Sequence, residues 1–88
     1  MDSAQRLLLQ ALLTGMGDAV RRNDASAADR YHRRLALIGP HFATNPAVSE
    51  ALERLHSASA RWLATDAAEH YAAEQQVLED IQRVMDFI

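Results

Sequence analysis

The side chains best suited to metal coordination or proton transfer are the four histidines of this 88-residue sequence. Glu53 and His56 stand three positions apart, the spacing used by helical bundles that bind iron or manganese between carboxylates and imidazoles. Two further sets have helical spacing: the pair Asp29 and His32, and the row Asp66, His70 and Glu74.

This spacing alone is a weak indication of a metal site. Acidic residues three or four positions from a histidine are common on any polar helix face. The flanking composition does not supply the two buried carboxylates that a di-metal site also needs. We therefore expect solvated or weakly paired histidines, with no metal ion and no cofactor. A metal-binding helical bundle built around Glu53 and His56 remains an alternative.

Nucleophilic catalysis has less support. The sequence contains no cysteine, and Ser57 and Ser59 flank no pocket that the sequence predicts. A thin helical body also leaves little volume for a substrate cavity. We expect the protein not to be an enzyme.

All nine basic residues are arginines, and they are unevenly distributed. Residues 1–44 have a net charge of +2 and residues 45–88 a net charge of −5, so the chain as a whole is at −3. A negative chain is a poor general binder of nucleic acid. A local basic cluster comprises Arg21, Arg22, Arg30, Arg33 and Arg34. We expect this cluster to face the acidic C-terminal half of this chain or of a partner.

The first predicted helix spans about Ser3 to Arg22, and its apolar residues fall on one face at helical spacing. These residues are Leu9, Leu12, Leu13, Met16 and Val20. Gly15 and Gly17 lie inside this helix, where each costs roughly 1 kcal/mol relative to alanine. They predict a kink or a close crossing of another helix.

A second helix is predicted to follow, with Ser26 and Asp29 as a capping box. Its apolar face comprises Ala28, Tyr31, Leu35 and Ile38, and Gly39-Pro40 ends it. We expect Phe42, in the loop beyond, to be buried under the helices.

A long third helix is predicted from Pro46 to Ile88. Asn45 is a favoured N-cap and Pro46 suits the first helical position, and no glycine or proline follows for 43 residues. The apolar stripe changes phase near residue 60. This change indicates either a bend or one continuous helix that contacts different neighbours at its two ends. Because no breaker residue is present there, we favour the continuous helix.

The predicted third helix would be about 64 Å long, whereas the first two helices laid end to end are about 50 Å long. The first two helices therefore cannot cover all of the apolar surface in its second half. From residue 67 the spacing resembles a heptad seam. We predict that a partner helix or a second copy packs there. The predicted partner-binding residues are Trp62, Leu63, Ala67, Tyr71, Leu78, Ile81 and Met85.

These elements predict one all-α domain over residues 1–88. The expected architecture is a three-helix up-down bundle with a long C-terminal helix, completed by a partner or by dimerisation. The run Leu7–Leu13 is interrupted by Gln10 and does not resemble a signal peptide or a membrane span. We therefore expect a cytoplasmic protein.

The order of these features resembles a known family. The features are, in order, a Leu-rich first helix, the turn Arg22-Asn23-Asp24, a second helix ending in Leu35-Ala36-Leu37-Ile38, a loop with proline and a long third helix. In this order the chain resembles the FliT-like chaperones of flagellar and type III secretion systems. The resemblance implies a cytoplasmic chaperone that holds an amphipathic helix of an export substrate.

The function that the sequence favours is therefore a non-enzymatic adaptor or secretion-type chaperone that binds an amphipathic helix of a protein partner. A homo-oligomeric structural or regulatory bundle and the metal-binding bundle are the alternatives.

Overall fold

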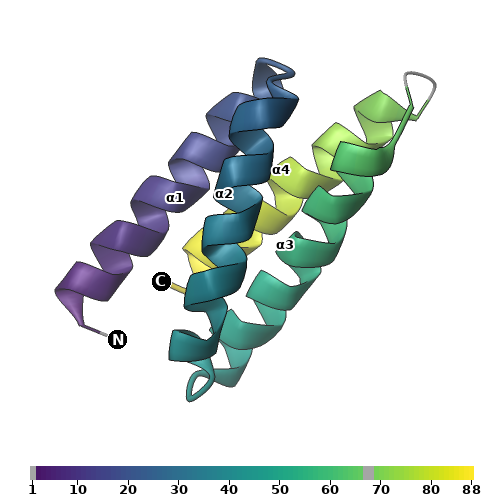
Figure 1. Cartoon of the computed structure of the whole chain (residues 1–88). Helices are drawn as coiled ribbons and strands as arrows, with labels where there is room; N and C mark the ends of the chain where they lie inside the picture. Colours follow the sequence, from purple (N-terminus) through teal and green to yellow (C-terminus); the bar gives the residue numbers. More distant parts are fainter. Residues whose placement is uncertain (1, 67–68) are drawn as a thin grey trace.

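The chain forms four α-helices, as seen in a computed structural model that describes residues 2–66 and 69–88 (Figure 1). They are α1 (Ser3–Arg21), α2 (Ala25–Ile38), α3 (Pro46–Ala64) and α4 (His70–Asp86), with a short 3-10 helix, η1 (Gly39–Phe42), between α2 and α3. Each helix packs on the next, and α4 also packs on α1. The expected all-α class is confirmed.

Side-chain caps set the starts of the first three helices. Asp2 accepts a hydrogen bond from the Gln5 backbone N–H at 2.7 Å, and Asn45 accepts one from Val48 at 3.4 Å with Pro46 in the first turn. The cap of α2 is Asp24, whose carboxylate accepts from Ala27 at 3.0 Å. The predicted capping box on Ser26 is therefore wrong by two residues.

The turn between α1 and α2 depends on Asn23, the one described non-glycine residue with a positive φ, at 57°. The Asp24 N–H bonds to the Ala19 carbonyl at 2.9 Å, and the Asn23 N–H bonds to the Val20 carbonyl at 3.0 Å. This pair of bonds is a Schellman motif, which needs a left-handed residue that asparagine tolerates better than most.

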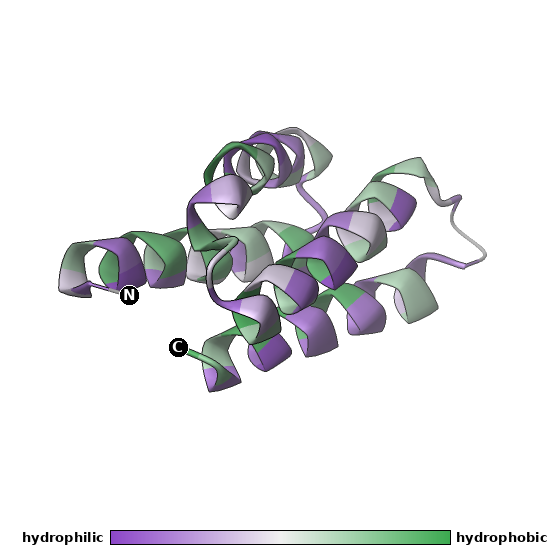
Figure 2. Ribbon diagram, turned by 90° about the horizontal axis from the view of Figure 1, so that it is seen from below, coloured by the Kyte–Doolittle hydropathy of each residue, from purple (hydrophilic) through white to green (hydrophobic). Residues whose placement is uncertain are grey.

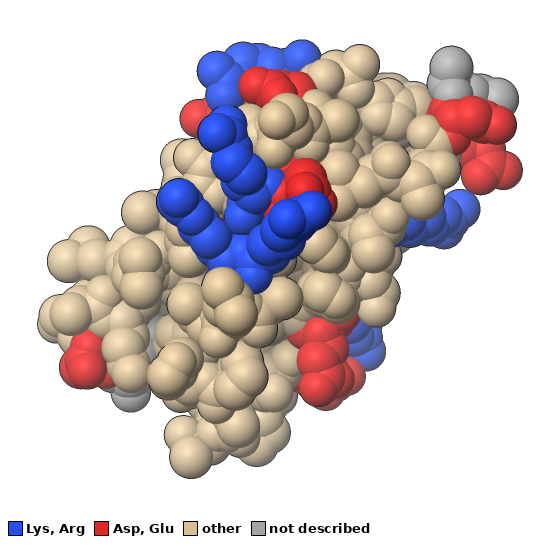
Figure 3. Space-filling model, in the orientation of Figure 1, with Lys and Arg blue, Asp and Glu red and all other residues tan. Residues whose placement is uncertain are grey.

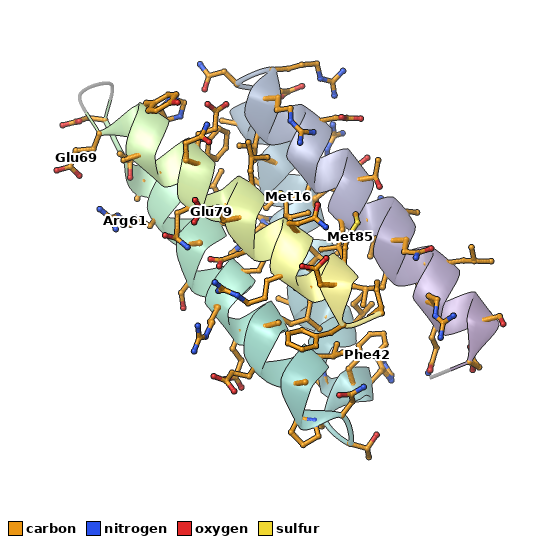
Figure 4. The ribbon with its side chains drawn as sticks, turned by 180° about the vertical axis from the view of Figure 1, so that it is seen from behind. Met16, Phe42, Arg61, Glu69, Glu79 and Met85 are labelled. Carbon is orange, nitrogen blue, oxygen red and sulfur yellow. The ribbon has the colours of Figure 1, made fainter. Side chains whose placement is uncertain are left out.

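The predicted apolar face of α1 is confirmed as the centre of the core, and Phe42 is buried at the end of the bundle as predicted. Viewed from behind, Met16 of α1 and Met85 of α4 lie along the seam between these two helices, and Phe42 lies where α4 ends (Figure 4). The largest fully buried side chains include Trp62, Leu9, Leu13, Met16 and Leu55.

Helix α1 runs without interruption through both of its internal glycines. A Cβ atom at Gly15 would overlap the ring of Tyr31, so this side chain of α2 packs directly on the backbone of α1. A Cβ atom at Gly17 would lie 3.8 Å from the Ile81 side chain, which is ordinary contact with α4. Gly15 therefore leaves room for a side chain of α2, and Gly17 lies against α4.

The predicted continuous helix from Pro46 to Ile88 is wrong. α3 ends at Ala64, and Thr65 adopts an extended conformation with φ −82° and ψ 141°. The Thr65 hydroxyl donates to the Arg61 carbonyl, a local bond that competes with continuation of the helix. Figure 1 shows α4 returning beside α3, so these two helices form a hairpin.

Tertiary burial explains why the helix breaks where no glycine or proline is present. Folding back places Val77, Ile81 and Val84 in the core, and burial stabilises by about 1.5–3 kcal/mol for each side chain of this size. A straight helix would leave these side chains in water. The C-terminal apolar surface that seemed to require a partner is therefore largely covered by the chain itself.

The buried face of α4 is also rotated from the predicted seam. Its buried residues are Ala73, Val77, Asp80, Ile81 and Val84, whereas Tyr71 is 74% exposed. The molecule measures 40 × 20 × 19 Å along its principal axes. Seen from below, hydrophobic residues concentrate on the inner sides of the helices (Figure 2). Among the described residues, no helix has the length and hydropathy needed to cross a bilayer.

Candidate functional site

A groove of about 500 Å³ lies between α2, η1 and α3. Its floor is apolar because Leu35, Leu52 and Leu55 are each at least nine-tenths buried there. The rim is open to solvent, since Ala36, Pro40, Ala43, Glu53, His56 and Ser57 are exposed. The groove is thus an open trough and not an enclosed cavity.

Small residues line much of this rim. Ala36 and Gly39 stand on the α2 side, Ala43 follows η1, and Ser49 lies near the start of α3. Short side chains allow the backbone of another helix to approach closely. Ser49 and Ser59 are ten positions apart on α3, so this wall of the groove is about 15 Å long.

Two histidines meet at this groove. The rings of His32 on α2 and His56 on α3 are stacked, with centroids 4.4 Å apart and an interplanar angle of 15°. His32 Nδ1 lies 2.5 Å from the hydroxyl of Ser59, which is 1% exposed. The fold therefore brings together the histidines of the Asp29/His32 and Glu53/His56 pairs, which are 24 positions apart in sequence.

Hydrogen bonding indicates the protonation of this cluster. The Ser59 hydroxyl donates to the His56 backbone carbonyl at 3.1 Å, so its oxygen accepts a hydrogen bond from the Nδ1–H of His32. His32 is then the Nδ1–H tautomer, with a free lone pair on Nε2. Because Ser59 is buried and its proton is committed, it is not placed to act as a nucleophile.

The pKa of His32 is lowered from its usual value of 6.5. Burial is the main cause, and positive charge on His56 is the next. Arg33 also lowers the pKa, while the Asp29 carboxylate acts in the opposite direction. The lowered pKa favours the neutral form of His32 at neutral pH.

The same geometry is unfavourable for a metal ion. Two nearly parallel stacked rings direct their nitrogen lone pairs side by side, whereas a shared metal requires lone pairs that converge on one point. Within residues 2–66 and 69–88, no group of three His, Asp or Glu side chains is arranged to hold a metal. His70, from the third predicted set, stacks on Trp62 with centroids 5.1 Å apart.

The predicted partner-binding residues do not form one surface. Trp62 and Ile81 are 2% and 7% exposed and belong to the core. Leu63, Leu78 and Met85 are partly buried against it. Tyr71 projects into solvent, and Ala67 lies outside the described residues.

The sequence alone did not predict this groove. Periodicity placed Leu35 on the apolar face of the second helix, but it gave no indication that a trough opens between α2 and α3. A usable signal was the spacing of three small residues at positions i, i+3 and i+7, namely Ala36, Gly39 and Ala43.

A second polar cluster lies between α3 and α4. Asp80 is 3% exposed; its carboxylate is 2.9 Å from Arg83 and accepts a hydrogen bond from Gln76 at 3.2 Å. Figure 4 shows Arg61 and Glu69 toward the turn between these helices. The buried carboxylate is satisfied by neighbours on its own helix, so its role is structural.

Comparisons with protein-family models, with curated proteins and with solved structures gave no match.

Proposed function

We propose that this chain is a non-enzymatic adaptor that holds an amphipathic helix of a partner protein in the groove between α2 and α3. The observation that carries the proposal is the groove itself, with the leucine floor and the small-residue rim described above. Helix-in-groove recognition places apolar anchors at positions i, i+3 or i+4, and i+7 into such a trough.

The dimensions of the groove suit this kind of ligand. Anchors at i and i+7 are about 10.5 Å apart, which fits within the wall of about 15 Å between Ser49 and Ser59. The exposed rim residues Glu53 and His56 would contact the polar flank of the bound helix. An open trough suits a chain that lies along it better than a substrate that must be enclosed for catalysis.

The experiment blocks the groove without changing the core. Ala36 is exposed on the rim, and A36W would fill the trough with an indole. A72W places the same side chain at an exposed position on α4 and serves as the matched control. Immobilised wild-type protein and the two variants are exposed to extract of the native cell, and the captured proteins are identified.

We expect A36W to lose a specific partner by about tenfold or more, while A72W and the wild type retain it. A peptide from that partner containing its amphipathic helix should then compete for binding. Equal capture by all three proteins would show that the groove is not the binding site. Circular dichroism and thermal unfolding establish that both variants are folded.

A narrower form of the proposal is a cytoplasmic export chaperone. It rests on the resemblance to the FliT-like chaperones and predicts that the partner lost by A36W is an exported flagellar or secretion protein. A partner with no connection to export would leave the adaptor proposal intact and remove the narrower one.

A further inference from the structure

The outer face of α1 and α2 carries exposed leucines beside exposed arginines. Leu37 on α2 is 75% exposed, and Leu8 on α1 is 52% exposed. Figure 3 shows basic side chains at the centre of this side of the molecule, over α2, with uncharged surface below and beside them over α1 and the lower part of α2. This face is separate from the groove between α2 and α3.

Helical spacing places the polar and apolar parts of the face together. Arg30, Arg34 and Leu37 are at positions i, i+4 and i+7, so they form one stripe along the outside of α2. The close approach of Gly15 to Tyr31 sets the level of α1 against α2. The two helices run in opposite directions. Leu8 lies seven residues before Gly15, and the end of α2 lies seven residues after Tyr31. Leu8 is therefore level with the end of α2.

The arginines of this stripe are not neutralised within the described chain. Arg33 pairs with Asp29 at 3.0 Å, but Arg30 and Arg34 form no ion pair with any described residue. Like charges at i and i+4 lie about 5–6 Å apart and repel. A carboxylate supplied from outside would remove this repulsion.

We propose that the α1–α2 face, defined here by Leu8, Arg30, Arg34 and Leu37, is a second docking surface for an acidic amphipathic helix of another protein. The leucines would contact the apolar stripe of that helix, and the two arginines would pair with acidic residues flanking the stripe. The charge pairs set the orientation and speed of association, and the leucines supply the contact area. The chain would then engage two partners through opposite sides of α2.

The test uses the full chain and two synthetic helices of about 18 residues, roughly 27 Å long. Both carry the same leucine stripe; one has flanking glutamates and the other has lysines at the same positions. Binding is measured by fluorescence anisotropy for the wild type and for R30E/R34E. The control R6E/R61E makes the same change in net charge at exposed sites. Arg6 lies about 200° round α1 from Leu8 and is therefore not on the proposed face.

The acidic peptide is expected to bind the wild type and R6E/R61E equally. R30E/R34E should weaken its binding by at least about tenfold and should gain affinity for the lysine peptide. L8E/L37E should abolish binding of both peptides with helicity retained, since both side chains are more than half exposed. A36W, which blocks the groove, should bind the acidic peptide like the wild type. The proposal for this surface and the proposal for the groove are therefore tested separately.

Three results would overturn the proposal. The first is undiminished binding of the acidic peptide by R30E/R34E. The second is a wild-type dimer in sedimentation equilibrium that L8E/L37E converts to monomer, because a second copy would then occupy the face. The third is binding to phosphatidylserine vesicles, lost in R30E/R34E, without binding of either peptide.

Discussion

At the scale of single residues, the histidines show how tertiary contact changes the meaning of a sequence pattern. Glu53 and His56 had the spacing of metal ligands, yet His56 stacks on His32 and the buried hydroxyl of Ser59 fixes the tautomer of His32. Helical spacing describes only neighbours on one helix. The interaction that defines this site joins two helices.

The lowered pKa of His32 predicts acid sensitivity. The folded state binds fewer protons at this ring than the unfolded chain does, so its contribution to stability is complete above about pH 6.5 and is lost as the pH falls through the folded pKa. We expect the free energy of unfolding to decrease between about pH 7.5 and pH 5 more steeply in the wild type than in H32N. Asparagine keeps a donor for Ser59 but does not titrate.

Urea unfolding over this pH range measures the difference. H41N is the control, because His41 is exposed on η1, and it should keep the wild-type slope. Parallel profiles for the wild type and H32N would show that this ring does not link stability to pH.

The two glycines of α1 give a second prediction. Replacing either glycine by alanine gains about 1 kcal/mol of helix propensity. At Gly15 the added methyl group displaces the ring of Tyr31, whereas at Gly17 it makes only ordinary contacts. We expect G15A to be less stable than G17A by about 1–3 kcal/mol, the usual cost of overpacking. Thermal unfolding of the two variants measures this, and equal stabilities would contradict the packing of the Tyr31 ring on Gly15.

At the scale of elements, the hairpin of α3 and α4 replaces the predicted long helix. The change of phase in the apolar stripe near residue 60 was a correct observation, but a hairpin between Ala64 and His70 accounts for it. Helix propensity could not reveal the turn, because alanine, threonine and aspartate there are all compatible with a helix at a cost below 1 kcal/mol each. Burial of the apolar face of α4 outweighs that cost.

Substitutions on α4 separate the two architectures. In the folded-back helix Ile81 is 7% exposed, so I81A should cost about 2–5 kcal/mol through lost burial and a cavity. Y71A, at a residue that is 74% exposed, should change stability by less than about 0.5 kcal/mol. Chemical unfolding of both variants is the measurement. Similar small effects at both positions would indicate that α4 does not pack on the chain.

At the scale of the whole molecule, four short helices share one core. α4 contacts both α1 and α3, and Val77 and Val84 are fully buried between its neighbours. An 88-residue chain has a small core, so the loss of one helix removes a large fraction of a net stability that is typically 5–15 kcal/mol.

A chain shortened to residues 1–65 should therefore lose cooperative unfolding. Its exposed core faces should bind the dye ANS or associate with one another. Differential scanning calorimetry and sedimentation velocity, with the full chain as the control, measure both effects. A cooperative transition of a monomeric shortened chain would show that the core forms without α4. In that case α4 would be an extension available to bind a partner.

The sequence by itself determined the local features of this protein. The apolar stripe from Leu9 to Val20 defined α1, Asn45-Pro46 defined the start of α3, and Phe42 was identified as a buried residue between helices. Periodicity, capping and proline geometry act within a few residues, so each can be read along the chain.

Only the tertiary structure decided which faces remain uncovered. It buried Ile81, exposed Leu37 and opened the groove beside His32. The reason is physical: burial depends on which helices meet, and the reversal after Ala64 changed the neighbours of every residue in the second half of the chain. Sequence periodicity gives a helix its apolar side, but the fold decides what that side contacts.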